Sequence, residues 1–169
     1  MTIKAMMRTF IPIRITLAAL ALLALPTAAS AVEFTPDELA RLSAGKIVKH
    51  RLPKSGQGGF GGGTAYALID APRDKVWRAI ENFAAYPTIF PNTYECKEVS
   101  RKGNSSLVKM KLGHPLVSVV YHVQFVRQPQ KNVIRFDLVE NMPHDIDDAR
   151  GYWRLFPQSD GRTLVAYVF

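Results

Sequence analysis

Residues 70–91 read DAPRDKVWRAIENFAAYPTIFP, and the pattern of this stretch decides the fold. Pro72 and Asp74 are typical of the first turn of a helix, where no backbone N–H needs a partner and an anion meets the positive end of the helix dipole. Large apolar side chains then follow on one stripe at helical spacing: Val76, Trp77, Ile80 and Phe83. Such a stripe predicts a helix with one face against a core. The Tyr86-Pro87 step predicts its end, because the residue before a proline disfavours the helical conformation, and we expect one more short helical turn over 88–92.

Segments with strand character surround this helical stretch. One strand is expected before it, over 64–69, and the strands that follow it are expected over 94–101, 106–113, 116–127, 132–140, 150–157 and 162–169. Short turns rich in glycine, proline, asparagine and aspartate separate these segments. This spacing of turns is typical of an antiparallel meander.

Several short motifs stand in a characteristic order along the chain. They are Ile69-Asp70-Ala71-Pro72, Val76-Trp77, Ile80, Phe83, Tyr86-Pro87, Phe90-Pro91, Gly151-Tyr152-Trp153-Arg154-Leu155 and Asp160-Gly161-Arg162-Thr163. Together they resemble the START-like (SRPBCC, helix-grip) superfamily, and most closely its polyketide cyclase/dehydrase and coenzyme Q-binding branch. The resemblance covers about residues 61–169. It implies an α+β fold in which a curved antiparallel sheet of about seven strands wraps a long C-terminal helix, with an apolar ligand between them.

The end of the chain departs from that pattern. The sequence stops at Phe169, in or just after the last expected strand, so the long C-terminal lid helix of the pattern is absent. An uncovered apolar sheet face would be a larger exposed patch than monomers usually have. We therefore expect the START-like domain over 61–169 to be C-terminally incomplete, as the truncated product of a longer gene. The alternatives are that a protein partner or self-association covers the open face, or that a helix over 36–43 covers part of it.

The first 31 residues have a different composition from the rest. Three basic residues come first, the apolar run Ile15–Leu25 follows, and the small residues Ala29-Ser30-Ala31 close the segment. This is the pattern of a Sec-type secretory signal peptide over 1–31, and the run is shorter than the about 20 residues of a membrane-spanning helix. We expect an exported chain, periplasmic or secreted. The alternative is an uncleaved anchor, which would be the chain's only contact with a membrane.

Residues 32–60 connect this segment to the START-like domain. A capping-box pattern predicts a helix over 36–43, and a strand is expected over 46–52. The glycine-rich connector 55–63 contains the pattern GxGxxG. A dinucleotide site needs a helix directly after that pattern, whereas a strand follows here, so the connector predicts no nucleotide site.

Charge and reactive side chains exclude several classes of function. Without residues 1–31 the chain keeps 19 basic residues against 14 acidic ones, a net charge of +5, and the charges are interleaved. This is not the basic patch of a nucleic-acid-binding protein. Cys96 is the only cysteine, so no internal disulfide forms, and we expect it to be buried or half-buried in a strand. The histidines lack metal-ligand spacing and the acidic loop 144–148 lacks the regular ligands of a calcium site, so we expect no metal and no cofactor.

Candidate binding residues come from the apolar phase of the expected elements. In 132–140, for example, Phe136 points to one face of the strand, and Arg135 and Asp137 point to the other, toward solvent. We expect the wall of the ligand pocket to include Trp77, Tyr121, Phe136, Leu138, Trp153 and Tyr167.

No catalytic set stands out in the sequence. Ser118 and His122 fall on one strand face, but about 13 Å apart along the strand, which is too far for a hydrogen bond. The predicted function is therefore non-catalytic binding of a hydrophobic small molecule, such as a lipid, a quinone or a polyketide-like compound. Two alternatives remain. One is a polyketide cyclase or dehydratase that uses polar groups in the same cavity, chosen from Tyr121, His122, Arg135 and Asp137. The other is a protein-interaction module.

Overall fold

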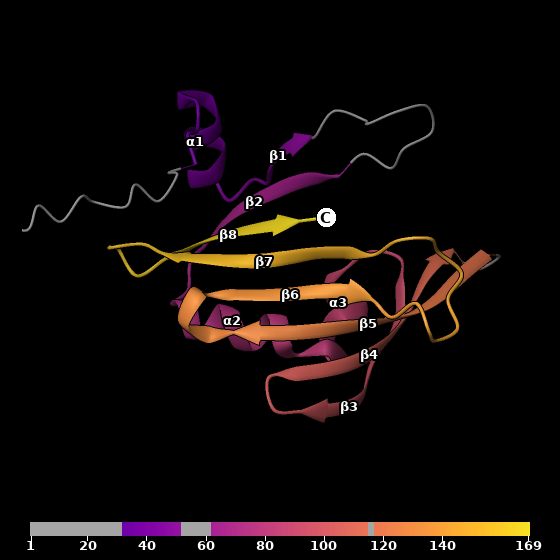
Figure 1. Ribbon diagram of the computed structural model, residues 1–169. Helices are drawn as coiled ribbons and strands as arrows, with labels where there is room; N and C mark the ends of the chain where they lie inside the picture. Colours follow the sequence, from indigo (N-terminus) through magenta and orange to yellow (C-terminus); the bar gives the residue numbers. More distant parts are fainter. Residues whose placement is uncertain (1–31, 52–61, 115–116) are drawn as a thin grey trace, which may run out of the picture. The chain divides into compact units, whose positions relative to one another are not determined.

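Residues that were expected to form separate strands join into one antiparallel sheet of eight strands, with the order β1-β2-β8-β7-β6-β5-β4-β3 (Figure 1). The computed structural model describes residues 32–51, 62–114 and 117–169. The strands are β1 Val48–Arg51, β2 Gly63–Ile69, β3 Thr93–Lys102, β4 Ser105–His114, β5 Val117–Gln128, β6 Val133–Leu138, β7 Arg150–Pro157 and β8 Thr163–Val168. The α-helices are α1 Pro36–Ser43, α2 Arg73–Glu81 and α3 Tyr86–Ile89. The predicted α+β class with a curved antiparallel sheet is confirmed. The predicted signal segment and the GxGxxG glycines lie outside the described residues.

Strand pairing places the two ends of the START-like region side by side. The strands from β3 to β8 follow one another as antiparallel neighbours, and β2 pairs with β8 over Thr64–Ile69. Strand β1 then pairs with β2, which gives one strand more than the about seven expected. Val48 lies opposite Tyr66 and is almost fully buried, so β1 is a packed part of the sheet.

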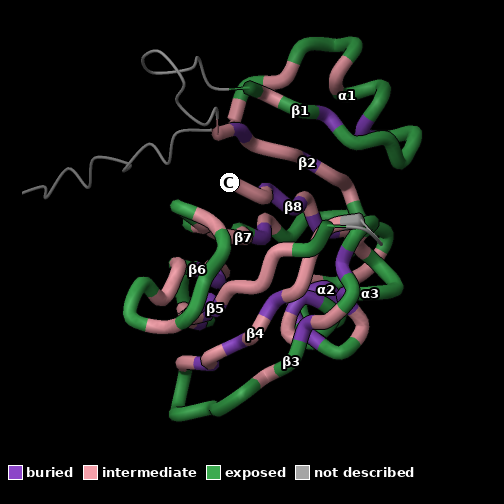
Figure 2. The backbone as a smooth tube through the Cα atoms, turned by 90° about the vertical axis from the view of Figure 1, so that its right-hand side faces the viewer, coloured by how far each residue is buried: buried purple, intermediate pink, exposed green. Residues whose placement is uncertain are grey.

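One face of the sheet, called the inner face below, carries the core. The predicted apolar stripe of α2 is buried against it: Val76, Trp77, Ile80 and, just beyond the helix, Phe83. These side chains pack with inward residues of the strands, among them Val108, Phe125, Ile134 and Leu155, in a single core. Helices α2 and α3 lie on the same side of the sheet, and buried positions concentrate in α2 and the strands that face it (Figure 2).

The predicted end of the first long helix is wrong. Helix α2 ends at Glu81, and Asn82 leaves the helical conformation with φ −81° and ψ 73°. Tyr86, by contrast, is helical with φ −55° and ψ −40°, and it begins α3, so the expected turn over 88–92 starts earlier. Its buried hydroxyl donates a hydrogen bond of 2.8 Å to the carbonyl oxygen of Ile80. This anchor and the burial of the ring offset the conformational preference of a residue before proline.

Helix α1 has the predicted capping box. The Thr35 hydroxyl accepts a hydrogen bond from the Glu38 backbone N–H, and the Glu38 carboxylate accepts one from the Thr35 backbone N–H at 2.9 Å. The helix packs on β1 and β2 beside an aromatic group in which Phe34 meets Tyr66 edge to face, 5.0 Å between ring centroids. None of the described helices is both long and apolar enough to cross a bilayer.

Candidate functional site

The inner face of the sheet holds a cavity of about 260 Å³, which we call the chamber. Its wall comes from the α3 segment up to Thr93 and from strands β4 to β8, together with Ala149 just before β7. All of its lining residues lie in the described part of the chain, and no aspartate, glutamate, histidine, lysine or arginine is among them. The chamber is thus an apolar and aromatic space whose side-chain polar groups are those of tyrosines, one threonine and the indole N–H of Trp153.

Only some of the six predicted wall residues line the chamber. Four of them line the chamber: Tyr121, Phe136, Trp153 and Tyr167. Trp77 is instead packed in the core, with the guanidinium carbon of Arg73 4.2 Å from its ring centroid. Leu138 is half-buried and lines neither the chamber nor the groove described below. Alternation along a strand identifies the face of a side chain but does not tell whether the side chain meets a hollow or another side chain.

The chamber also contains wall residues that the sequence did not single out. They include Phe90, Pro91, Thr93, Met110 and Ala149. Phe90 and Pro91 belong to the motif Phe90-Pro91, which was used only to recognise the fold. The signal that could have found them is the position of this motif directly after the short helix, where the chain returns to the sheet.

A stack of aromatic rings forms one side of the chamber. Tyr167 on β8 stacks on Trp153 of β7, with ring centroids 4.2 Å apart and planes inclined by 28°. It also stacks on Phe136 of β6, at 5.8 Å and 23°. Phe136 and Tyr167 are on strands separated by β7, and they meet because Gly151 on β7 has no side chain between them.

The three tyrosines of the wall differ in their hydrogen bonds. Tyr86 donates to Ile80, whereas the hydroxyl groups of Tyr121 and Tyr167 form no hydrogen bond with the described residues. Burial raises the pKa of Tyr121 to about 12, and the neighbouring Tyr167 and Cys96 add to the rise. Burial also raises the pKa of Tyr167. Both phenols therefore stay protonated at neutral pH and keep an O–H group that can donate.

A second hollow, which we call the groove, lies between α2 and strands β2 and β8 and has a volume of about 580 Å³. Its wall includes three exposed isoleucines, Ile47, Ile69 and Ile89. Among its lining residues, all of which are described, Lys75 is the one charged side chain. The groove shares with the chamber Tyr86, Phe90, Pro91, Trp153 and Tyr167. No residue of α1 lines either hollow, so the alternative that this helix covers part of the inner face does not apply to the chamber or the groove.

Polar residues considered for catalysis lie mostly outside the chamber. Arg135 and Asp137 are exposed and project from the opposite face of β6, as expected for a solvent-facing pair. His122 is buried, but its Nδ1 atom lies 3.1 Å from the carbonyl oxygen of Pro143 in the loop that follows β6, and it lines neither hollow. Of the four candidates, Tyr121 alone reaches the chamber.

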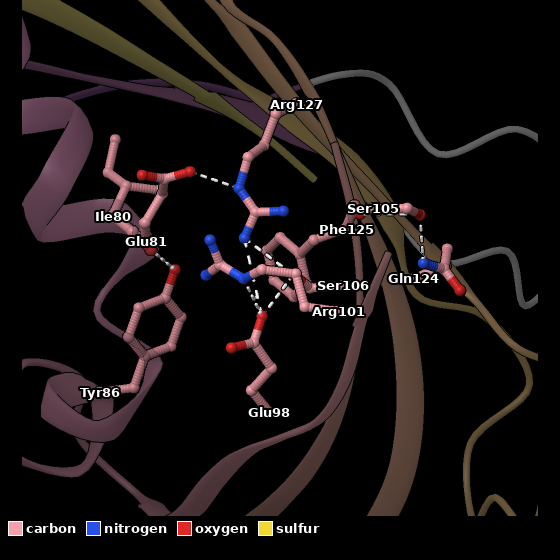
Figure 3. A network of polar contacts seen from close by, with 10 residues as sticks. All are labelled: Ile80, Glu81, Tyr86, Glu98, Arg101, Ser105, Ser106, Gln124, Phe125 and Arg127. Carbon is pink, nitrogen blue, oxygen red and sulfur yellow. Dashed lines mark hydrogen bonds and ion pairs between the residues drawn. The ribbon is translucent and has the colours of Figure 1, made fainter. Parts of the chain in front are cut away.

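A polar network beside the core ties α2 to the sheet (Figure 3). Arg127 of β5 is 6% exposed and forms ion pairs with Glu81 at the end of α2 and, at 3.8 Å, with Glu98 of β3. It also donates a 2.8 Å hydrogen bond to the hydroxyl of Ser106 on β4. Arg127 therefore links the helix to three strands of the sheet. Its Nη1 atom is the one fully buried side-chain polar atom of the described residues that has no partner.

Cys96 and the acidic residues form no reactive or metal-binding centre in the described residues. Cys96 is buried on β3, with its sulfur 3.1 Å from the sulfur of Met110, and burial raises the pKa of its thiol to about 12. A protonated thiol is a poor nucleophile. Within residues 32–51, 62–114 and 117–169, no group of three or more histidine, cysteine, aspartate or glutamate side chains is placed to hold a metal ion.

Comparison with known proteins agrees with this geometry. Residues 69–169 match the protein family described as polyketide cyclase/dehydrase and lipid transport. Among solved structures, a STAR-related lipid transfer protein from Xanthomonas axonopodis is similar with a TM-score of 0.63 at 15% identity, over 72% of this chain and 74% of that one. The Zhui aromatase/cyclase from Streptomyces sp. R1128 has a TM-score of 0.55 at 19% identity, over 73% of this chain and 65% of the enzyme.

A START superfamily protein from Mycobacterium smegmatis is similar as well, with a TM-score of 0.54 at 17% identity over 63% of this chain and 73% of that one. A comparison with curated protein sequences gave no significant match. At these identities the solved structures establish the fold and leave the ligand open.

Proposed function

The chain belongs to the polyketide cyclase/dehydrase and lipid transport family, and from that premise we propose that it binds a hydrophobic small molecule in the chamber and releases it unchanged. The observation that carries this proposal is the composition of the chamber wall, which joins apolar side chains and aromatic rings and contains no carboxylate, imidazole, ammonium or guanidinium group. Burial of apolar ligand surface supplies the affinity, at about 25 cal/mol per Å² before the costs of association.

The same wall argues against the cyclase alternative. General acid–base chemistry at neutral pH needs a group whose pKa lies near 7 within hydrogen-bonding reach of the substrate. The titratable side chains that line the chamber are tyrosines, and burial moves the pKa of Tyr121 further from that range. Turnover of a polyketide substrate by the purified protein, lost in Tyr121→Phe, would favour the cyclase instead.

Native mass spectrometry of the protein purified from its own host tests the binding proposal. We expect a co-purifying apolar compound whose mass is unchanged after release. Ala149→Trp should abolish it, because Ala149 is half-buried in the chamber wall and the indole would fill the space. Ala84→Trp is the matched control, since Ala84 is exposed and lines neither hollow. A compound retained equally by both variants would contradict binding in the chamber.

We further propose that the chain acts outside the cytoplasm, in the periplasm or as a secreted protein. The support is the basic and apolar pattern of residues 1–31, which ends in small residues. Intact-mass analysis of the protein from its host should give a chain that starts at Val32. A chain that retains residues 1–31 and sediments with the membrane would favour the anchor.

A further inference from the structure

We propose that the hydroxyl groups of Tyr121 and Tyr167 make the chamber selective for an uncharged ligand that carries a hydrogen-bond-accepting oxygen next to a planar ring. The inference rests on the proposed function, because it names the class of ligand that the same chamber takes. It assigns two specificity-determining residues, which act by donating their O–H groups.

The first support is the difference among the three tyrosines of the wall. Tyr86 uses its hydroxyl to hold the carbonyl oxygen of Ile80, so it has no proton left to donate to a ligand. The hydroxyl groups of Tyr121 and Tyr167 have no hydrogen-bond partner among the described residues. Neither oxygen is fully buried, since Arg127 Nη1 is the one fully buried side-chain polar atom of those residues without a partner. A phenol on an apolar wall usually finds an acceptor, and a ligand in the chamber supplies one.

Both hydroxyl groups belong to side chains of the same chamber wall, Tyr121 from β5 and Tyr167 from β8. Both side chains are half-buried on the chamber wall. A carbonyl oxygen accepts hydrogen bonds and carries no charge, so a ketone or quinone-type carbonyl matches the phenol donors of this wall.

The absence of cationic side chains from the chamber wall also favours an uncharged ligand. A carboxylate or phosphate that enters an apolar space must find a cation or lose much of its hydration energy. The chamber wall contains no lysine, arginine or histidine. Lys75 belongs to the wall of the groove and not to that of the chamber. An anionic head group therefore has no partner where the ring binds.

The aromatic stack accounts for the planar ring. Tyr167 is held between its contacts with Trp153 and Phe136, whose centroids lie 4.2 Å and 5.8 Å from its own. These contacts restrict the Tyr167 ring and so fix where its hydroxyl points. A flat ligand ring can pack on the faces and edges of the same aromatic wall in offset or edge-to-face geometry.

Three naphthalene probes with the same ring separate these contributions in the full chain purified from its host. They are 2-acetylnaphthalene, which carries a carbonyl, 2-ethylnaphthalene, which lacks it, and 2-naphthoate, which is an anion. We expect the wild-type protein to bind the ketone about tenfold more tightly than the hydrocarbon, and the anion more weakly than either. Tyr121→Phe and Tyr167→Phe should each weaken ketone binding several-fold and leave hydrocarbon binding unchanged, since each removes one oxygen and keeps the ring.

The control is Tyr152→Phe, because Tyr152 lies on the same strand as Trp153, points to the other face and lines neither hollow. Thermal unfolding monitored for each variant shows that the fold is retained. Equal binding of ketone and hydrocarbon by the wild type, unaffected by the two substitutions, would overturn the inference and leave the proposed function standing. Binding of 2-naphthoate as tight as that of the ketone would overturn it too. Failure to bind any of the three probes would overturn the inference, whereas the proposed function is decided by the co-purification experiment above.

Discussion

Phe136 reaches across Gly151: a Cβ atom at position 151 would lie 2.6 Å from the Cζ atom of Phe136. The same added atom would lie 2.0 Å from the carbonyl oxygen of Val168 on β8. Glycine at this point of β7 therefore permits two things at once, the pairing with the neighbouring strand and the stack of Phe136 on Tyr167.

Gly151→Ala should accordingly damage both stability and ligand binding. The clash with backbone cannot be relieved by a side-chain rotation, and overpacking of this kind costs about 1–3 kcal/mol. We expect urea unfolding to show a loss of that size and the chamber to lose its ligand. Gly103→Ala is the control: it meets no atom within 4 Å but has φ +56°, so it should strain the turn and leave binding intact. Wild-type binding by Gly151→Ala would contradict this account of the stack.

Replacement of Arg127 should lower the free energy of unfolding more than replacement of any other charged residue. Arg127→Met removes a buried cation, breaks the ion pair of Glu81 and leaves Glu98 with Arg101 as its remaining ion-pair partner. We expect a loss of about 3 kcal/mol in the free energy of unfolding, at the lower end for buried pairs because both carboxylates reach solvent. Arg150→Met breaks an exposed pair with Asp148 and should cost less than about 1 kcal/mol. Equal losses of unfolding free energy for the two variants in chemical denaturation would show that the ion pairs of Arg127 do not hold α2 to the sheet.

Protonation of Glu98 should contribute to the loss of folding stability at acid pH. Burial acts to raise the pKa of this carboxyl, but hydrogen bonds from Ser106 and Arg101 outweigh it and hold the pKa below its ordinary value of 4.5. A lowered pKa in the folded state stabilises the fold above pH 4.5, and this contribution is lost as the pH falls through the folded-state value. Urea titrations from pH 6 to roughly 3 should show a smaller loss of stability in Glu98→Gln than in the wild type. Glu140→Gln, an exposed change outside the network, should match the wild type.

Cys96 should report unfolding of the whole domain. Its thiol is buried and its pKa is raised to about 12, so the reactive thiolate is scarce at pH 8. We expect iodoacetamide to label Cys96 at the rate at which the domain unfolds. Mass spectrometry at a series of urea concentrations measures this labelling rate. Labelling of the native protein at the rate of a free thiol would mean that β3 opens locally.

Much of the fold follows from alternation along the chain. Alternation along 116–127 puts Tyr121 and Phe125 on one face of the strand and His122 on the other, and the structure has the first two on the inner face. The same pattern could not anticipate Arg127, which continues the inward phase of β5. Its main partner, Glu81, lies 46 residues away in α2 and becomes a neighbour only when the helix packs on the sheet.

Two other features depend on neighbours across strands. In the sequence, nothing distinguishes Gly151 from any other glycine at the start of a strand. Glycine is required there because Phe136 and the backbone of Val168 leave no room for a Cβ atom. Trp77 and Leu138 were expected in the pocket wall because they belong to the apolar phase, and both lie outside the hollows. The position of a hollow depends on where helices α2 and α3 leave the inner face uncovered, which local sequence does not encode.

The sheet has two edge strands, β1 and β3, and each has features that oppose the addition of a further strand. Strand β1 has four residues, with Lys49 and Arg51 exposed. Strand β3 has two register irregularities and the exposed cations Lys97, Arg101 and Lys102. Short length, bulges and lysines are the means by which natural sheets resist growth from one molecule to the next. These features of both edges oppose the assembly of folded copies of this domain into an extended intermolecular sheet.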